Sequence, residues 1–106
     1  MPVSGNSTLG YVVGTGSFTA SGAGTTVPLA RPGYFNISLQ GTFVATVVLQ
    51  RSFDGSTWET ITYSDGSSLS WSAPFSSIWS EPGDGVSYRF NCTAYTSGTV
   101  NWRISQ

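Results

Sequence analysis

The side chains that can do chemistry in this sequence are few, and their types exclude most catalytic and metal-binding designs. The chain has no histidine and a single cysteine, Cys92. This excludes Ser-His and Cys-His nucleophilic catalysis, most zinc sites and an intrachain disulfide. The remaining acid–base candidates are carboxylates, at Asp54, Glu59, Asp65, Glu81 and Asp84.

The spacing of these carboxylates favours turns over catalysis. Three of them stand directly before a glycine, in the pairs Asp54-Gly55, Asp65-Gly66 and Asp84-Gly85. Asp-Gly pairs favour tight turns. Asp54 and Glu59 together can in principle hydrolyse a glycoside, but a small sandwich rarely supplies the cleft. Glu81 and Asp84 lack the dense oxygen ligands of a calcium loop. We therefore predict that the protein is not an enzyme and uses no cofactor and no metal.

Three tryptophans in the middle of the chain leave two interpretations open. Trp58, Trp71 and Trp79 would stack on sugar rings if they were exposed, as in a carbohydrate-binding module. Tryptophan also serves in cores and as an anchor in protein interfaces. We favour core or interface for these three and expect Trp102, which alternates with polar neighbours, in the core.

Charge is scarce and dispersed, which excludes several classes of partner. Only 8% of the residues are charged, against about 25% in ordinary soluble domains. The basic residues are Arg31, Arg51, Arg89 and Arg103. They form no basic patch, so we expect no nucleic-acid partner. The apolar runs fall short of the roughly 20 residues that span a bilayer. We expect no membrane partner, no secretion signal and synthesis in the cytoplasm.

The elements that position these residues are predicted to be strands. Apolar and polar residues alternate, as in Phe35, Ile37 and Leu39, and turn residues recur at short intervals. Candidate strands lie near 8–13, 16–20, 25–30, 34–40, 43–52, 57–63, 68–72, 77–80, 86–95 and 99–105. We predict an all-β fold, an antiparallel β-sandwich that is jelly-roll-like with about eight strands. Asp54-Gly55 is expected to form a type I′ hairpin turn, and Pro28 is expected on an edge strand.

The chain is predicted to be a single domain with a distinct beginning. Residues 1–30 are rich in Gly, Ser and Thr and carry no charged residue, whereas 31–106 hold the sandwich core. The first part is interpreted either as the first strands or as an arm that orders against a partner. Under the second interpretation, the contact residues are Leu9, Tyr11, Phe18 and Arg31.

Part of the sequence resembles small β-sandwich structural proteins of tailed bacteriophage virions. The resemblance covers about residues 34–106 and rests on Val48 to Trp58 (VLQRSFDGSTW), Tyr88-Arg89-Phe90, Ser97-Gly98-Thr99-Val100 and Arg103 to Gln106. It implies a capsid decoration or staple protein on the virion surface, with the major capsid protein as partner. We expect a homodimer or homotrimer, since symmetric assembly multiplies modest contacts. A tail, baseplate or fibre component and a carbohydrate-binding module remain the alternatives.

Overall fold

The computed structural model describes residues 12–106, and this part of the chain consists of antiparallel strands without a helix. The strands are β1 (Val13–Phe18), β2 (Gly22–Ala23), β3 (Val27–Pro28), β4 (Gly33–Gln40), β5 (Phe43–Ser52), β6 (Glu59–Thr60), β7 (Ser70–Trp71), β8 (Phe75–Glu81), β9 (Ser87–Gly98) and β10 (Val100–Ser105). Four of these strands have only two residues. The predicted all-β class is therefore confirmed.

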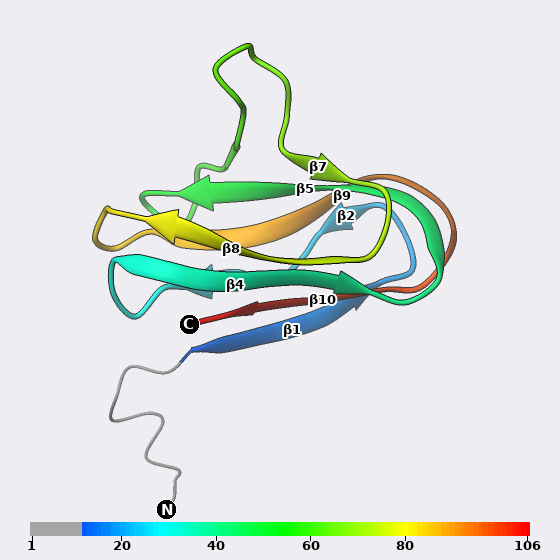
Figure 1. Cartoon of the computed structure of the whole chain (residues 1–106), viewed down its shortest axis with the longest axis horizontal. Helices are drawn as coiled ribbons and strands as arrows, with labels where there is room; N and C mark the ends of the chain where they lie inside the picture. The colour runs from blue at the N-terminus through cyan, green and yellow to red at the C-terminus, as the bar shows by residue number, and fades with distance from the viewer. Residues whose placement is uncertain (1–11) are drawn as a thin grey trace, which may run out of the picture.

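The strands form two sheets that lie face to face (Figure 1). The first sheet has the order β1-β10-β4-β8. In the second, β9 and β5 are central, β2 and β3 both pair with β9, and β6 and β7 both pair with β5. The short strands β2 and β3 can be counted together as one position, and so can β6 and β7. The eight positions then have the orders 1-8-3-6 and 2-7-4-5 in the two sheets. This is the arrangement of a jelly roll, in agreement with the predicted sandwich.

The core lies between the sheets and follows the alternation along each strand. In β4 and β10, the inward residues are fully buried, and the alternating outward residues include Asn36, Asn101 and Arg103. The inward set is Phe35, Ile37, Leu39, Val100, Trp102 and Ile104. Aromatic contacts join the two sheets, with ring centroids 4.5 Å apart for Phe35 and Tyr88. Each such buried side chain stabilises the fold by about 1.5–3 kcal/mol relative to exposure.

The second sheet has irregular edges, and here the strand predictions differ most from the structure. The predicted strand 25–30 shrinks to β3, and β2 forms where no strand is predicted. Pro28 lies on that edge as expected. The predicted strand 57–63 shrinks to β6, because Ile61 donates to Leu49 and then accepts from Leu69. Those bonds turn residues 62–68 away from the sheet, and they form the projecting hairpin between β6 and β7 in Figure 1.

The expected type I′ turn at Asp54-Gly55 is wrong. That turn needs a positive φ at both central residues, but among the described residues only glycines, including Gly55 at +78°, have one. The Asp54 carboxylate accepts hydrogen bonds from the backbone N–H groups of Ser56 (2.8 Å) and Thr57 (2.7 Å). These bonds hold a wider loop, so β5 and β6 pair only from Arg51 and Glu59 onward.

Candidate functional site

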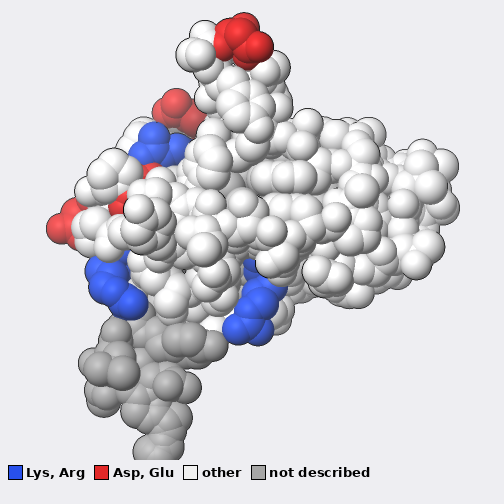
Figure 2. All heavy atoms as spheres, viewed as in Figure 1, with Lys and Arg blue, Asp and Glu red and all other residues white. Residues whose placement is uncertain are grey.

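One end of the sandwich carries no charged side chain. We call it the uncharged end and define it by residues 41–46, 72–74 and 93–99, none of which is Asp, Glu, Lys or Arg. In Figure 2 the right-hand part of the molecule is free of charged side chains. The same view in Figure 1 places the β4–β5 and β9–β10 connections there. The charged residues of the described chain therefore gather away from this end.

A small hollow opens at the uncharged end. It has a volume of about 280 Å³ and is lined by Phe43, Val44, Ala45, Thr46, Ser72, Ala94 and Thr96. Two irregularities interrupt the β5–β9 pairing beside the hollow, at Val44/Ala45 and Thr46/Val47. Val44 is 58% exposed, and the next residue, Ala45, is buried. The hollow thus presents an apolar side chain beside two threonine hydroxyls.

The backbone beside this hollow is held by a hydrogen bond and by a glycine. The Tyr95 hydroxyl donates to the carbonyl of Gly98 at 2.6 Å. Gly98 has a φ of +88°, and a Cβ there would lie 2.2 Å from the Thr42 carbonyl oxygen. Only glycine fits this close approach of the two turns. The β4–β5 and β9–β10 turns are therefore held close together at this end.

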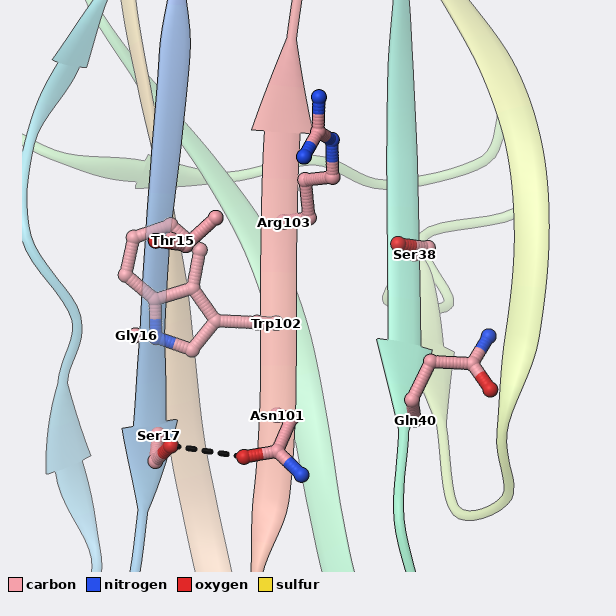
Figure 3. Close-up of a pocket in the computed structure, with 8 residues that line it drawn as sticks. All are labelled: Thr15, Gly16, Ser17, Ser38, Gln40, Asn101, Trp102 and Arg103. Atoms are coloured by element: carbon pink, nitrogen blue, oxygen red, sulfur yellow. Dashed lines mark hydrogen bonds between the residues drawn. The ribbon is translucent and has the colours of Figure 1, made fainter.

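A second hollow lies on the outer face of the first sheet (Figure 3). It has a volume of about 400 Å³ and is lined by Thr15, Gly16, Ser17, Ser38, Gln40, Asn101, Trp102 and Arg103. Ser17 donates to the Asn101 side-chain oxygen at 2.8 Å. The register places Arg103 between Thr15 and Ser38. This lining offers hydroxyls, amides and one cation but no carboxylate, so it can form hydrogen bonds but holds no acid–base pair.

The third hollow, of about 240 Å³, contains the most buried charge of the described chain. It is lined by Arg51, Ile61, Trp79, Ser80, Glu81, Pro82 and Tyr88. Glu81 is 1% exposed. Its carboxylate pairs with the Arg51 guanidinium and accepts hydrogen bonds from the Tyr88 hydroxyl (2.7 Å) and the Gly83 backbone N–H (2.8 Å). Since Glu81 lies in the first sheet and Arg51 and Tyr88 in the second, the cluster connects the two sheets.

The protonation states of Glu81 and Tyr88 fit a structural contact between the sheets. Burial raises the pKa of Glu81, but hydrogen bonds from Tyr88, Gly83 and Arg51 outweigh it and hold that pKa below its usual value. Burial, followed by the hydrogen bond to Glu81, raises the pKa of Tyr88. At neutral pH the carboxylate is therefore ionised and the phenol neutral, so Glu81 has no proton to donate and Tyr88 is no base.

The carboxylates of Asp54 and Asp65 hold turns. Backbone hydrogen bonds from Thr57 and Ser56, together with the Ser52 hydroxyl, lower the pKa of Asp54. The hydroxyl and backbone N–H of Ser67 lower the pKa of Asp65. Asp54 and Glu59 are the pair that could in principle hydrolyse a glycoside, and the Oδ1 atom of Asp54 accepts three hydrogen bonds from its own loop.

The three candidate sugar-stacking tryptophans do not share a platform. Trp58 stacks with the Arg89 guanidinium, 4.3 Å from the ring centroid. Trp71 stacks on Phe75 with centroids 4.1 Å apart and an interplanar angle of 6°. Trp79 lies at the hollow beside Glu81. All three are half-buried, and Trp71 and Trp79 pack against the core.

The candidate contact residues of the N-terminal region differ in burial and position. Phe18 is 6% exposed and belongs to the core, because the inward alternation of β1 ends on it. It therefore cannot contact a partner in this fold, which corrects the expectation. Arg31 is exposed, and its carbonyl accepts from the Gln106 side chain at 2.7 Å. Leu9 and Tyr11 lie outside the described residues.

Sequence reasoning missed Val44 and Thr96 at the uncharged end and the Arg51–Glu81 pair. The lack of charge in 41–46 and 93–99 is visible in the sequence, but only the β5–β9 pairing brings these segments together. Within residues 12–106, no group of three or more His, Cys, Asp or Glu could hold a metal, and no helix is long and apolar enough to cross a membrane. Comparison with protein-family models, curated proteins and solved structures found no significant match to the chain.

Proposed function

We propose that this protein is a non-enzymatic capsid decoration protein of a tailed bacteriophage, which binds the outside of the head shell and stabilises it. Its partner is the major capsid protein of the same virion. The proposal is supported by the resemblance of residues 34–106 to small virion β-sandwich proteins. It is also supported by the use of Glu81, Asp54 and Asp65 in holding the fold.

The uncharged end carries the proposal. Interface cores are depleted in charged residues relative to the rest of a protein surface. The uncharged end combines such depletion with an exposed Val44 and a hollow of about 280 Å³. An apolar side chain of the shell would enter this hollow without desolvating a charge. The surrounding threonine and serine hydroxyls would form hydrogen bonds with the polar groups of the shell next to that side chain.

The test is binding of the purified protein to shells of its own phage that lack it. Wild-type protein is expected to co-sediment with the shells and to raise the temperature at which they disrupt. Thr96→Lys places a charge in the hollow and is expected to weaken binding at least tenfold. Thr15→Lys makes the same change on the outer face of the first sheet and is expected to bind like wild type. Both threonines are exposed, so both variants should fold.

Three results would contradict the proposal. Wild-type protein that fails to bind the shell would exclude a decoration role. Equal binding by the Thr96→Lys and Thr15→Lys variants would exclude the uncharged end as the contact. Localisation of the labelled protein on tails instead of heads by electron microscopy would favour a tail, baseplate or fibre component.

A further inference from the structure

The edge of the first sheet that β8 forms is open and regular. β8 is the last strand of that sheet, and among the described residues it pairs only with β4. Figure 1 shows it along the side of the sandwich that faces the viewer. An open edge presents a row of unpaired N–H and C=O groups, which can pair with another strand.

The other edges of the described fold carry features that discourage such pairing. The outer edges of the second sheet are divided into the two-residue strands β2, β3, β6 and β7, and Pro28 lies in β3. In β1, two of the six residues are Gly14 and Gly16, and glycine weakens a strand. Short strands, proline and charge are the usual protections of an edge.

β8 lacks these protections along its whole length. Its seven residues pair with Gly33 to Leu39 of β4 in one continuous register. The strand contains no proline, and its one charged residue, Glu81, is its last residue and is buried. Pro74 and Pro82 flank the strand, and because proline has no N–H to donate, they limit pairing to this segment. The edge therefore offers a template for one partner strand of about the same length.

The side chains of β8 fit a second copy of the same strand. Ile78 is 62% exposed and points outward between Ser76 and Ser80. If two β8 strands pair antiparallel about Ile78, each Ile78 faces its own counterpart and Ser76 faces Ser80. On the inward side Ser77 faces Trp79, a small residue against a large one. No like charges oppose each other in this register, and opposed like charges would destabilise the pairing.

We propose that β8 pairs with β8 of a second copy of this chain about a two-fold axis at Ile78. The four-stranded first sheets of the two copies then form one continuous sheet. Such an isologous contact uses the same edge of both copies and closes after two, so it yields a dimer and no filament. The inference does not depend on capsid binding, because it uses a different surface from the uncharged end.

Sedimentation analysis over a concentration series tests the pairing. Wild-type protein is expected to approach twice its monomer mass of 11.2 kDa. Ile78→Lys and Ile78→Glu are each expected to remain monomeric, because they place like charges opposite each other. An equal mixture of the two variants is expected to recover the dimer. Val44→Lys, which alters an equally exposed residue at the uncharged end, should leave the dimer intact.

Disulfide formation gives a second readout that needs no charged variant. Directly opposed residues of antiparallel strands have Cα atoms about 4.5–5.5 Å apart, which a disulfide can bridge. Ile78→Cys is therefore expected to crosslink two chains under mild oxidation, whereas Val44→Cys is not. Wild-type protein that stays monomeric throughout the series would overturn the proposal. So would a dimer that survives Ile78→Lys, or an Ile78→Cys variant that does not crosslink.

Discussion

Glu81 is a carboxylate of the first sheet whose three hydrogen-bonding partners come from the second sheet and from the turn after β8. Arg51 and Tyr88 approach it from the second sheet, and the Gly83 N–H approaches it from the turn. Removing one partner from a buried pair is costly, because the other partner keeps an uncompensated charge. The charge of Glu81 therefore contributes to the stability of the sandwich.

Glu81→Gln should lower the free energy of unfolding at pH 7 by about 3 kcal/mol, at the low end for a buried pair because Arg51 is partly exposed. The pKa of Glu81 is depressed in the folded state. Its contribution is therefore present above the unfolded pKa of about 4.5 and is lost as pH falls through the folded pKa. Denaturant unfolding at pH 7 and at lower pH should show a shallower decline for the variant than for wild type. Parallel declines would contradict this role.

Cys92 is expected to be unreactive in the folded protein. The side chain is 1% exposed, and burial raises the pKa of its thiol. Since the thiolate is the reactive form, a thiol reagent should modify Cys92 only after unfolding. Reaction kinetics across a denaturant series check this, with Val44→Cys as the control that supplies an exposed thiol. Rapid modification of wild-type protein without denaturant would show that the core opens locally.

At the scale of the elements, the turns are held by two different devices. The β9–β10 turn depends on glycine geometry at Gly98, and the loop after β5 depends on the Asp54 carboxylate. We therefore expect a mutation at Gly98 to change the stability of the whole fold. We expect a mutation at Asp54 to change only the local protection of amides from hydrogen exchange.

Gly98→Ala should be more destabilising than Gly66→Ala by at least about 1 kcal/mol, the scale of an overpacked site. The two glycines have nearly the same φ, +88° and +89°, so the backbone penalty is shared. Only at Gly98 does an added Cβ meet other atoms, 2.2 Å from the Thr42 carbonyl oxygen, whereas none lies within 4 Å at Gly66. Thermal or denaturant unfolding measures the difference. Equal losses would show that the turns can move apart.

Asp54→Ala should release the loop between β5 and β6. The amides of Ser56 and Thr57 lose the carboxylate that accepts their hydrogen bonds. Their hydrogen exchange should become at least tenfold faster, while exchange in β4 and β10 stays unchanged. The matched variant Asp65→Ala should affect the amide of Ser67 instead. Unchanged exchange at Ser56 and Thr57 would show that Gly55 alone holds the loop.

The long strands could be predicted from the sequence because alternation and burial agree there. The segments predicted at 34–40, 43–52 and 99–105 correspond closely to β4, β5 and β10. The segments around β6 and β7 are less predictable, because Ile61 and Tyr63 alternate like a strand while the backbone turns away from the sheet. The local pattern does not show that the backbone of Ile61 bonds to both Leu49 and Leu69.

At the scale of the whole molecule, the candidate site could not be predicted from local pattern. The uncharged end combines segments about fifty residues apart, which meet only through the register of β5 and β9. The Arg51–Glu81 pair likewise depends on which strands face each other across the sandwich. The sequence did show that charge is rare and that histidine is absent, and those facts limit the chemistry without locating a surface.

The position of Gln106 bears on how a peptide or enzyme fused after it would be oriented. Its side chain binds Ala30 and Arg31, and its backbone pairs with Val12. These bonds hold Gln106 against the residue before β1 and against the β3–β4 connection. In Figure 1 the C-terminus lies at the opposite end of the sandwich from the β4–β5 and β9–β10 connections. A peptide or enzyme fused there would point away from a surface to which the uncharged end is attached, so the molecule would serve as an outward-facing display scaffold.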